Sequence, residues 1–171
     1  LSNSGLEYGK IVAEALEREQ STDDILTDAA ILLLPKYDVR DQEIKAEIKT
    51  KNGSFCIIGR PDTFNSTTKA FREYKTGKGA WTQSKAQKHP QMVFYAMLIY
   101  LKHNIIPTDI HLDWIETHDS PLGIKPTGKV ESFKINITLS DILSCMAETI
   151  KVAKEIEIAW VSHVKPIEEV F

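Results

Sequence analysis

The sequence predicts an α/β fold in which a central mixed β-sheet is flanked by helices. Segments with the apolar period of a helix alternate along the chain with segments in which every second residue is apolar, as in a strand. Their order is helix, helix, three strands, helix, two strands, helix, which is typical of one α/β domain with a mixed sheet. The length of 171 residues fits a single domain over residues 1–171 with its own core.

Two helices open the predicted fold. The first covers residues 6–18, where the apolar positions share one helix face and Ser and Asn residues precede it as caps. These apolar positions are Leu6, Val12, Ala15 and Leu16. Residues 21–24, Ser-Thr-Asp-Asp, start a second helix with acids where the helix dipole favours them. It continues through residues 25–34 until Pro35 stops it.

Three strands follow. Residues 43–50 alternate strictly between apolar and charged side chains, which predicts a half-exposed strand. The Lys-Asn-Gly sequence at residues 51–53 is a hairpin signal. It leads into residues 55–58, which are apolar on both faces, as expected of a central strand. After an Asn-Ser-Thr-Thr turn at residues 65–68, residues 70–75 form the third strand.

The second half of the chain completes the pattern. A helix begins at Ser84 or at Pro90, since proline suits the first helical turn, and ends near residues 102–104. Residues 109–116 read as a fourth strand, and residues 118–129, with two prolines and two glycines, are predicted to be a loop.

Residues 130–137 form a fifth strand, and Ser140 and Asp141 cap a last helix that reaches about Val161. Its apolar stripe predicts packing against the sheet, although a dimer interface explains the stripe equally well. The stripe contains Ile142, Met146, Thr149, Ile150, Ala153, Ile156 and Trp160.

The composition excludes several classes of protein. A net charge of −3 gives no general attraction to nucleic acid, so such binding needs a local basic patch. The longest apolar run, residues 92–101, is too short to cross a bilayer, and no leader opens the chain, so we expect a cytoplasmic protein with no membrane partner. The first residue is Leu1 rather than Met, which is compatible with a segment of a longer protein.

The two cysteines, Cys56 and Cys145, lie in apolar surroundings and are expected to be buried reduced thiols. An iron–sulfur cluster needs four closely spaced cysteines, so none is expected. The 5 histidines show no spacing typical of a zinc site. Polarity at His111 and Asp113 is read as the exposed face of a strand.

Three polar side chains in the middle of the chain suit a divalent-metal site. Asp62 stands where the strand of residues 55–58 leaves the sheet. Glu73 and Lys75 are two residues apart on the next strand and therefore point to the same side. If these strands pair, the carboxylates of Asp62 and Glu73 approach each other. With the backbone carbonyl of Tyr74 they offer hard oxygen ligands, which suit Mg²⁺ or Mn²⁺ rather than zinc.

Such a metal would polarise a scissile phosphate and activate a water molecule, while Lys75 would orient or help deprotonate that water. The Glu-x-Lys triplet alone is not specific, because it also occurs at residues 43–45 and 47–49. Those two copies lie on the alternating strand and are most simply its solvated face. Only the third copy has an Asp at the end of a buried strand before it.

These residues carry a resemblance to a known family. Pro61-Asp62 and Glu73-Tyr74-Lys75 match the two halves of the signature of the PD-(D/E)XK nuclease superfamily. Residues 91–95, Gln-Met-Val-Phe-Tyr, are similar to the Gln-x-x-x-Tyr motif of its RecB-like branch. The chain therefore resembles a RecB-like nuclease over roughly residues 9–100. The resemblance implies the restriction-endonuclease-like fold and metal-dependent cleavage of DNA, with Gln91 and Tyr95 touching the substrate phosphate or bracing the site.

The early helix matches that branch in part. Its members often carry Gly-x-x-x-His-x-x-x-Glu there, and Gly9, Ala13 and Glu17 fall at this spacing. The resemblance implies Glu17 as an additional metal ligand, with Glu14 or Glu7 as alternatives, whereas Ala13 removes the expected imidazole.

A basic cluster surrounds the predicted site and would track a phosphate backbone. It comprises Lys69, Arg72, Lys75, Lys78, Lys85 and Lys88, against the single acid Glu73. Trp81 in the same region would stack on an unpaired base, or else be tucked into the core.

The predicted function is a Mg²⁺- or Mn²⁺-dependent deoxyribonuclease, and two alternatives stay open. One is a non-catalytic nucleic-acid-binding or assembly module that kept the fold and lost turnover, which the missing histidine at Ala13 makes conceivable. The other is an RNA-cleaving relative. The sequence does not choose between exonuclease and endonuclease, between single- and double-stranded DNA, or between oligomeric states.

Overall fold

The computed structural model describes residues 4–40, 42–50 and 53–163. Its described helices are α1 (Ser4–Arg18), α2 (Ile25–Leu32), α3 (Gln83–Gln87), α4 (Pro90–His103) and α5 (Leu139–His163). Its described strands are β1 (Val39–Arg40), β2 (Ile44–Thr50), β3 (Gly53–Gly59), β4 (Thr63–Phe64), β5 (Phe71–Lys78), β6 (Ile110–Ser120) and β7 (Gly123–Ile135). The predicted hairpin residues 51 and 52 lie outside the described part.

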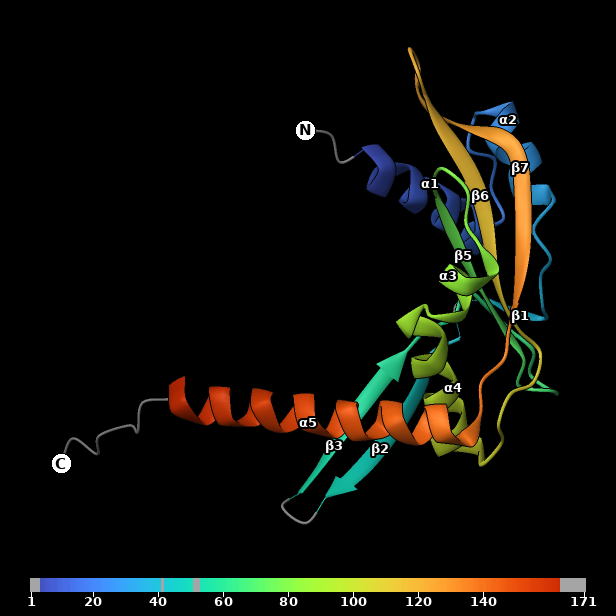
Figure 1. Ribbon diagram of the computed structural model, residues 1–171. Helices are drawn as coiled ribbons and strands as arrows, with labels where there is room; N and C mark the ends of the chain where they lie inside the picture. The colour runs from blue at the N-terminus through green and yellow to red at the C-terminus, as the bar shows by residue number, and fades with distance from the viewer. Residues whose placement is uncertain (1–3, 41, 51–52, 164–171) are drawn as a thin grey trace.

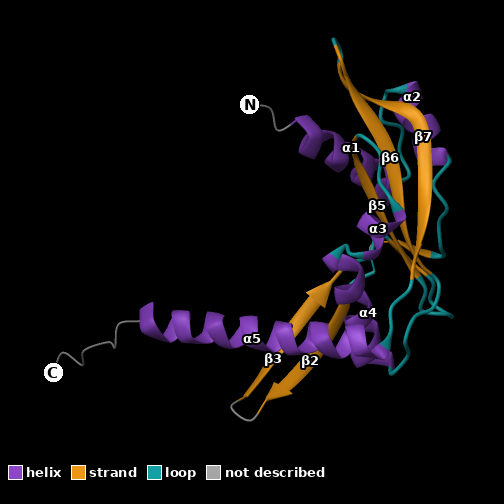
Figure 2. Cartoon of the chain, viewed as in Figure 1, coloured by secondary structure: helices purple, strands orange, loops and turns teal. Residues whose placement is uncertain are grey.

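The architecture is α/β, with a mixed sheet flanked by helices (Figures 1 and 2). The strand order is β1-β4-β5-β6-β7, and β5 and β6 are parallel while the other neighbours are antiparallel. A parallel pair needs a long crossover, which the segment containing α3 and α4 supplies. Strands β2 and β3 form a separate antiparallel hairpin.

Helices cover both faces of the sheet. On one face, α1 and α2 bury Tyr8, Val12 and Ile31 against Ile115 of β6. Leu6, which was expected on the buried stripe of α1, is 65% exposed. On the other face, α3, α4 and α5 enclose the larger apolar core. Its fully buried members include Phe71, Leu112, Met97, Leu98, Ile99 and Ile142.

Helix α4 shows how the sequence sets its ends. Both predicted starting points were partly right, because Ser84 lies in the short helix α3 and Pro90 opens α4. Proline at this position loses nothing, since its missing N–H would have no partner inside the helix. The helix ends at Asn104, which takes a left-handed conformation (φ 55°) and whose N–H donates to the carbonyl of Tyr100.

The prediction that β3 is a central strand was wrong. Within the described residues β3 pairs only with β2, and Ile58 is 49% exposed. The β2–β3 hairpin buries one face against α4 through Ile44 and Ala46 of β2. Only one face of the apolar run in β3 is therefore covered. The expectation of a buried Cys56 was also wrong because its side chain is exposed, whereas Cys145 is half-buried.

The predicted loop at residues 118–129 was wrong as well. Strands β6 and β7 run on through most of it and pair as far as Ser120 and Gly123. The register shifts between Ile115 and Thr117, and Gly128 adopts a left-handed φ of 88° there. A bulge of this kind lets glycine and proline sit within a ladder, which is why these residues misled the prediction.

Helix α5 does not pack along the sheet as predicted. Its first half contacts α4 and places Ile142 in the core, with Met146 packed against it. Its second half extends away from the domain (Figure 1), and Ile156 is 64% exposed. The side chain of Trp160 lies outside the described part. In the part of the chain that the structure describes, no helix is long and apolar enough to cross a membrane.

Candidate functional site

The structure brings Asp62, Glu73 and Lys75 together on the wall of one cavity of about 580 Å³. It does so by a different route from the predicted one, because β3 and β5 do not pair. Instead the two-residue strand β4 pairs with the start of β5, with Thr63 opposite Arg72. Asp62 directly precedes this ladder, so the turn between β4 and β5 carries it to β5.

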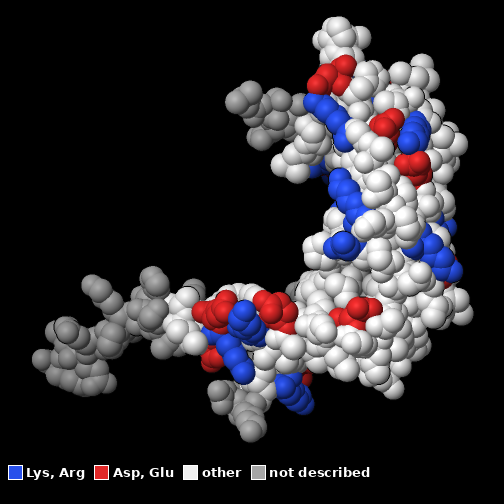
Figure 3. All heavy atoms as spheres, viewed as in Figure 1, with Lys and Arg blue, Asp and Glu red and all other residues white. Residues whose placement is uncertain are grey.

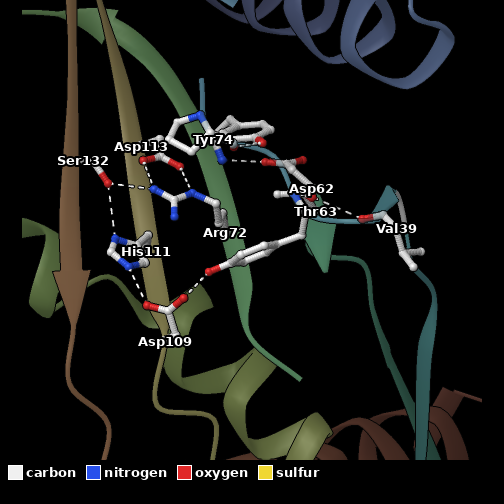
Figure 4. Close-up of polar contacts among 11 residues, drawn as sticks. Val39, Asp62, Thr63, Arg72, Tyr74, Asp109, His111, Asp113 and Ser132 are labelled. Atoms are coloured by element: carbon white, nitrogen blue, oxygen red, sulfur yellow. Dashed lines mark hydrogen bonds and ion pairs between the residues drawn. The ribbon is translucent and has the colours of Figure 1, made fainter. Parts of the chain in front are cut away.

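Asp62 is fixed to the backbone of β5. Its Oδ2 accepts a hydrogen bond from the N–H of Tyr74 at 2.6 Å (Figure 4). The ladder between β4 and β5 ends at Thr63 and Arg72, so no residue of β4 pairs with Tyr74. The Asp62 carboxylate accepts the hydrogen bond of the Tyr74 N–H instead. A charge-assisted bond of this length is among the stronger ones and holds the side chain in one orientation.

Glu73 is buried and only half satisfied. It is 3% exposed; its Oε1 accepts from Lys75 Nζ at 2.6 Å, and its buried Oε2 has no hydrogen-bond partner among the described residues. Burial and then the neighbouring Asp62 carboxylate raise the pKa of Glu73 to about 8, and Lys75 opposes this rise. Without a further cation the site therefore keeps Glu73 protonated at neutral pH, and a bound cation would take the place of that proton.

These residues fit a divalent cation of the Mg²⁺ or Mn²⁺ type. The orphaned Oε2 of Glu73 is an oxygen donor that needs a partner, and Asp62 supplies a second carboxylate on the same cavity. Tyr74 lines this cavity too, and its backbone carbonyl remains a predicted ligand. Among the described residues no three His, Cys, Asp or Glu side chains form a group that could hold a metal. Water and substrate oxygens would therefore complete the coordination shell, as is usual for Mg²⁺.

Helix α1 forms the opposite wall. Gly9, Ala13 and Glu17 all line the cavity, as the spacing of the early motif predicts. A Cβ at Gly9 would lie 3.4 Å from Thr76 Oγ1, so a small residue there lets α1 approach β5 closely. Glu17 is exposed on this wall, outside any three-residue ligand group of the described chain, and its role as a ligand remains a prediction.

Two cations on the cavity wall were not predicted. Arg40 donates to the carbonyl of Leu16 at 2.7 Å and pairs with Glu19 at 2.6 Å, which ties β1 to the end of α1. Nothing in the sequence around Arg40 indicates this position. Lys10 also lines the cavity, and the signal that could have found it is its helical spacing of three and seven residues from Ala13 and Glu17.

Gln91 and Tyr95 share one face of α4, as predicted. Gln91 Nε2 donates to the Tyr95 hydroxyl at 2.6 Å, and that hydroxyl donates to the carbonyl of Arg60 at 2.9 Å. Burial, and next the negative charge of Glu73, raise the pKa of Tyr95, which keeps its hydroxyl protonated as a donor. Because Arg60 lies two residues before Asp62, the pair braces the segment that presents the carboxylate.

The packing beneath this brace is tight. A Cβ at Gly59 would lie 2.5 Å from Leu98 Cδ1 and 2.9 Å from the ring of Tyr95. Phe71 meets the Tyr95 ring edge-to-face with centroids 5.7 Å apart. The end of β3, the start of β5 and α4 therefore form one rigid support under the site.

Arg72 does not belong to an exposed basic cluster. It is 7% exposed, and its guanidinium donates to both carboxylate oxygens of Asp113 at 2.8 and 2.9 Å and to Ser132 Oγ at 2.8 Å (Figure 4). This placement corrects the prediction that Arg72 contacts nucleic acid. It also corrects the exposed-face interpretation of Asp113, which is fully buried.

The ion pair continues into a hydrogen-bond network on this face of the sheet. Ser132 Oγ lies 3.2 Å from His111 Nδ1, and His111 Nε2 lies 2.9 Å from Asp109 (Figure 4). The hydroxyl of Tyr37 also donates to Asp109. These bonds join β5, β6 and β7 and satisfy the buried charges, so the network holds the sheet together behind the site.

The remaining predicted basic residues are spread out. Lys69 donates to the carbonyl of Ser66 in the turn between β4 and β5, and Lys78 pairs with Asp119 near the far end of β5. Lys88 is exposed at the end of α3. Lys85 lies over the ring of the half-buried Trp81, with its Nζ 4.4 Å from the ring centroid.

Comparison with known proteins adds little to this geometry. No protein-family model and no curated protein matches the chain. It is similar to a solved structure, the crystal structure of SSO0001, with a TM-score of 0.39 and 16% sequence identity. The similarity covers 67% of this chain, which spans 50% of that chain. A similarity of this size does not define a fold. The fold and the site define an α/β protein in which a buried glutamate with one unpartnered oxygen in the described chain lies beside a half-buried aspartate and a lysine.

Proposed function

We propose that this protein is a divalent-metal-dependent nuclease with the restriction-endonuclease-like fold, which hydrolyses phosphodiester bonds of DNA. One observation carries the proposal. The buried Oε2 of Glu73 lacks a hydrogen-bond partner in the described chain, beside Asp62 and Lys75 on an open cavity. A buried carboxylate without a partner is costly, so without a cation the folded chain keeps Glu73 protonated up to about pH 8. A hard cation suits the two carboxylates and would take the place of that proton.

Each residue has a definite task. Asp62 and Glu73 would hold Mg²⁺ or Mn²⁺, which supplies Lewis-acid activation of the phosphate and of a water molecule. Lys75, held at 2.6 Å from Glu73 and 27% exposed, lines the cavity and would orient the attacking water. Its positive charge would also offset the charge that builds up on the phosphate in the transition state. Tyr95 and Gln91 would fix the segment of Asp62 through the carbonyl of Arg60.

The test uses conservative variants at the three positions. Asp62→Asn, Glu73→Gln and Lys75→Met should each slow cleavage of labelled DNA by about 10²- to 10⁴-fold in Mg²⁺ or Mn²⁺. The matched control is the exposed copy of the same triplet on β2, with Glu47→Gln and Lys49→Met, which should cut at the parent rate. If Glu73→Gln or Lys75→Met cuts DNA as fast as the parent, the assignment is wrong. Far-UV circular dichroism checks that each variant is folded.

Parallel digestion of single-stranded DNA, duplex DNA and RNA separates the deoxyribonuclease from its RNA-cleaving alternative. Digestion of circular and of linear plasmid then distinguishes an endonuclease from an exonuclease. RNA cleaved in preference to both DNA substrates would overturn the proposed substrate while leaving the metal site in place.

A second candidate function is a non-catalytic module of the same fold. It is favoured by the absence of a three-residue ligand group in the described part of the chain and by Ala13 on the cavity wall. Calorimetric titration with Mn²⁺ separates the two. The nuclease predicts binding that Asp62→Asn weakens, and the module predicts either no heat of binding or heat that Asp62→Asn leaves unchanged.

A further inference from the structure

Trp81 forms the top of an aromatic stack beside the candidate site. Its ring stacks on Trp114 with centroids 5.1 Å apart and planes 30° from parallel. The ring of His89 lies 5.6 Å from Trp81, and the ammonium of Lys85 stands 4.4 Å from the Trp81 centroid. Trp81, Lys85 and His89 over Trp114 are called the tryptophan patch below.

Trp81 lies in the segment between β5 and α3, and the elements on either side of it are held in place. Trp114 is 4% exposed and its ring lies over Gly77, where a Cβ would come within 2.5 Å of Trp114 Cη2. The helix that follows Trp81 is fixed to the end of β7 and the residue after it. Gln83 donates to the carbonyl of Lys134 at 2.6 Å, and Gln87 donates to that of Asn136 at 2.7 Å. The half-buried Trp81 is therefore presented in one orientation before any ligand arrives.

The tryptophan patch adjoins the candidate site. Lys75 and Trp114 are neighbours in the parallel ladder of β5 and β6 and so project from the same face of the sheet. Burial, and next the ammonium groups of Lys75 and Lys85, lower the pKa of His89, so its ring is uncharged at neutral pH.

The chain segment that carries Trp81, Lys85 and His89 has charge of one sign. Residues 74–108 contain no Asp and no Glu. Lys85 of α3 and Lys88, which caps the end of α3, are both exposed, and neither makes an ion pair within the described chain. In Figure 3, Lys and Arg side chains near the middle of the concave side stand apart from the acidic ones. The segment that carries Trp81 therefore brings only positive charge to the patch. The nearby carboxylates belong to other elements: Glu131 lies opposite Trp114 in the β6–β7 ladder and pairs with Lys129. Asp141 and Glu148 line a cavity together with Lys88 and His89.

The relative strengths of two interactions decide whether the Lys85 ammonium keeps a base from stacking on Trp81. A cation over an exposed tryptophan is worth a factor of about 2 to 5 in an equilibrium constant. A base stacked on an aromatic side chain is worth a factor of about 5 to 150. A base therefore displaces the ammonium, and the freed lysine, on its flexible stem, can reach the phosphate of the same nucleotide.

We propose that the tryptophan patch binds an unpaired nucleotide of single-stranded DNA next to the scissile position, with the base on Trp81 and Lys85 on its phosphate. The inference rests on the proposed nuclease function and deepens it, because it selects substrates with a single-stranded segment. A base inside a duplex has both faces covered by its neighbours and cannot stack on Trp81. Blunt duplex DNA would meet only the lysines.

The test measures binding of a labelled oligo-dT of about 12 nucleotides and of a blunt duplex, by fluorescence anisotropy with the full chain in EDTA. Trp81→Ala should weaken oligo-dT binding by about 5- to 150-fold and leave duplex binding unchanged, whereas Trp81→Phe should keep most of the affinity. Lys85→Ala should lower the salt dependence of oligo-dT binding by about one in log–log slope. The control is Lys151→Ala on the exposed side of α5.

Oligo-dT should also quench tryptophan fluorescence in the parent, and much less in Trp81→Phe, whose fold is expected to be intact. Equal oligo-dT affinity in the parent and in both Trp81 variants would overturn the inference, as would an equal loss for oligo-dT and duplex. The two proposals fail separately. If Trp81→Ala binds oligo-dT like the parent while Glu73→Gln fails to cut DNA, only the tryptophan patch is rejected. If Glu73→Gln cuts DNA at the parent rate while Trp81→Ala binds oligo-dT more weakly, only the nuclease is rejected.

Discussion

Replacing Glu73 by glutamine should change how stability depends on pH when no metal is present. Burial and the Asp62 carboxylate raise the pKa of Glu73 from its ordinary 4.5 to about 8 in the folded protein. Between these values the folded chain holds a proton that the unfolded chain has released. Stability must therefore fall as the pH rises through this window, because the unfolded state binds fewer protons there.

The size of the effect follows from the pKa difference. A rise of about 3.5 corresponds to about 5 kcal/mol at about 1.36 kcal/mol for each pKa unit, reached only when the pH exceeds the folded-state value. Glutamine has the same shape and does not ionise, so Glu73→Gln should lose this slope. The variant should match the parent within about 1 kcal/mol near pH 5 and exceed it by several kcal/mol near pH 8 to 9, with about 5 kcal/mol as the limit.

Urea unfolding in EDTA at a series of pH values measures the difference. His89 and His103 titrate in the same range, but their lowered pKa values act with the opposite sign and are common to both proteins. The control is Glu47→Gln on β2, whose carboxylate is exposed. Mn²⁺ at about 100 times its dissociation constant should restore about 2.7 kcal/mol to the parent at pH 8 and much less to Glu73→Gln.

One result refutes the reasoning. If the parent and Glu73→Gln curves run parallel from pH 5 to pH 8, within about 0.5 kcal/mol, the Glu73 carboxylate is not held protonated by its surroundings. The cavity would then hydrate this carboxylate well enough to keep it charged, and its unpartnered Oε2 would no longer indicate a cation site.

Three further predictions concern the support of the site. Arg72→Met should destabilise the fold by about 3–5 kcal/mol in urea unfolding, since it leaves the carboxylate of Asp113 buried without its partner; a loss under about 1 kcal/mol would contradict the buried pair. Tyr95→Phe should lower Mn²⁺ affinity or cleavage by about 10- to 100-fold in a folded protein, because the segment of Asp62 loses its hydrogen bond, and parent-like values in both assays would argue against the brace. Gly77→Ala should cost about 1–3 kcal/mol and alter the near-UV circular dichroism, because the new methyl group meets the ring of Trp114, whereas an unchanged spectrum would contradict the close contact.

The sequence predicted best what depends on local geometry. Glu73 and Lys75 share a side because side chains alternate along a strand, and Gln91 reaches Tyr95 because four residues make about one helical turn. Gly9, Ala13 and Glu17 share the cavity wall for the same helical reason. Each of these relations is complete within a few residues, so no knowledge of the tertiary fold was needed.

The contacts that could not be predicted from the sequence join residues that lie far apart in the chain. Arg72 lies among lysines in the chain, and only a carboxylate 41 residues away, Asp113, makes it a buried ion pair instead of a surface cation. Trp81 similarly rests on Trp114, which belongs to a strand that the sequence did not place beside it. Local composition carries no signal for such pairs, whose energies depend on burial.

Asp62 reaches Glu73 although the pairing predicted to bring them together does not exist, and the reason defines how the site is built. The geometry belongs to the turn between β4 and β5, where Thr63 faces Arg72 and the Asp62 carboxylate closes on the N–H of Tyr74. The β2–β3 hairpin contributes through the carbonyl of Arg60, which directly follows it and receives the Tyr95 hydrogen bond. Changes on the exposed face of that hairpin should therefore spare the site, whereas changes at its end at Gly59, which packs on Tyr95, should reach Asp62.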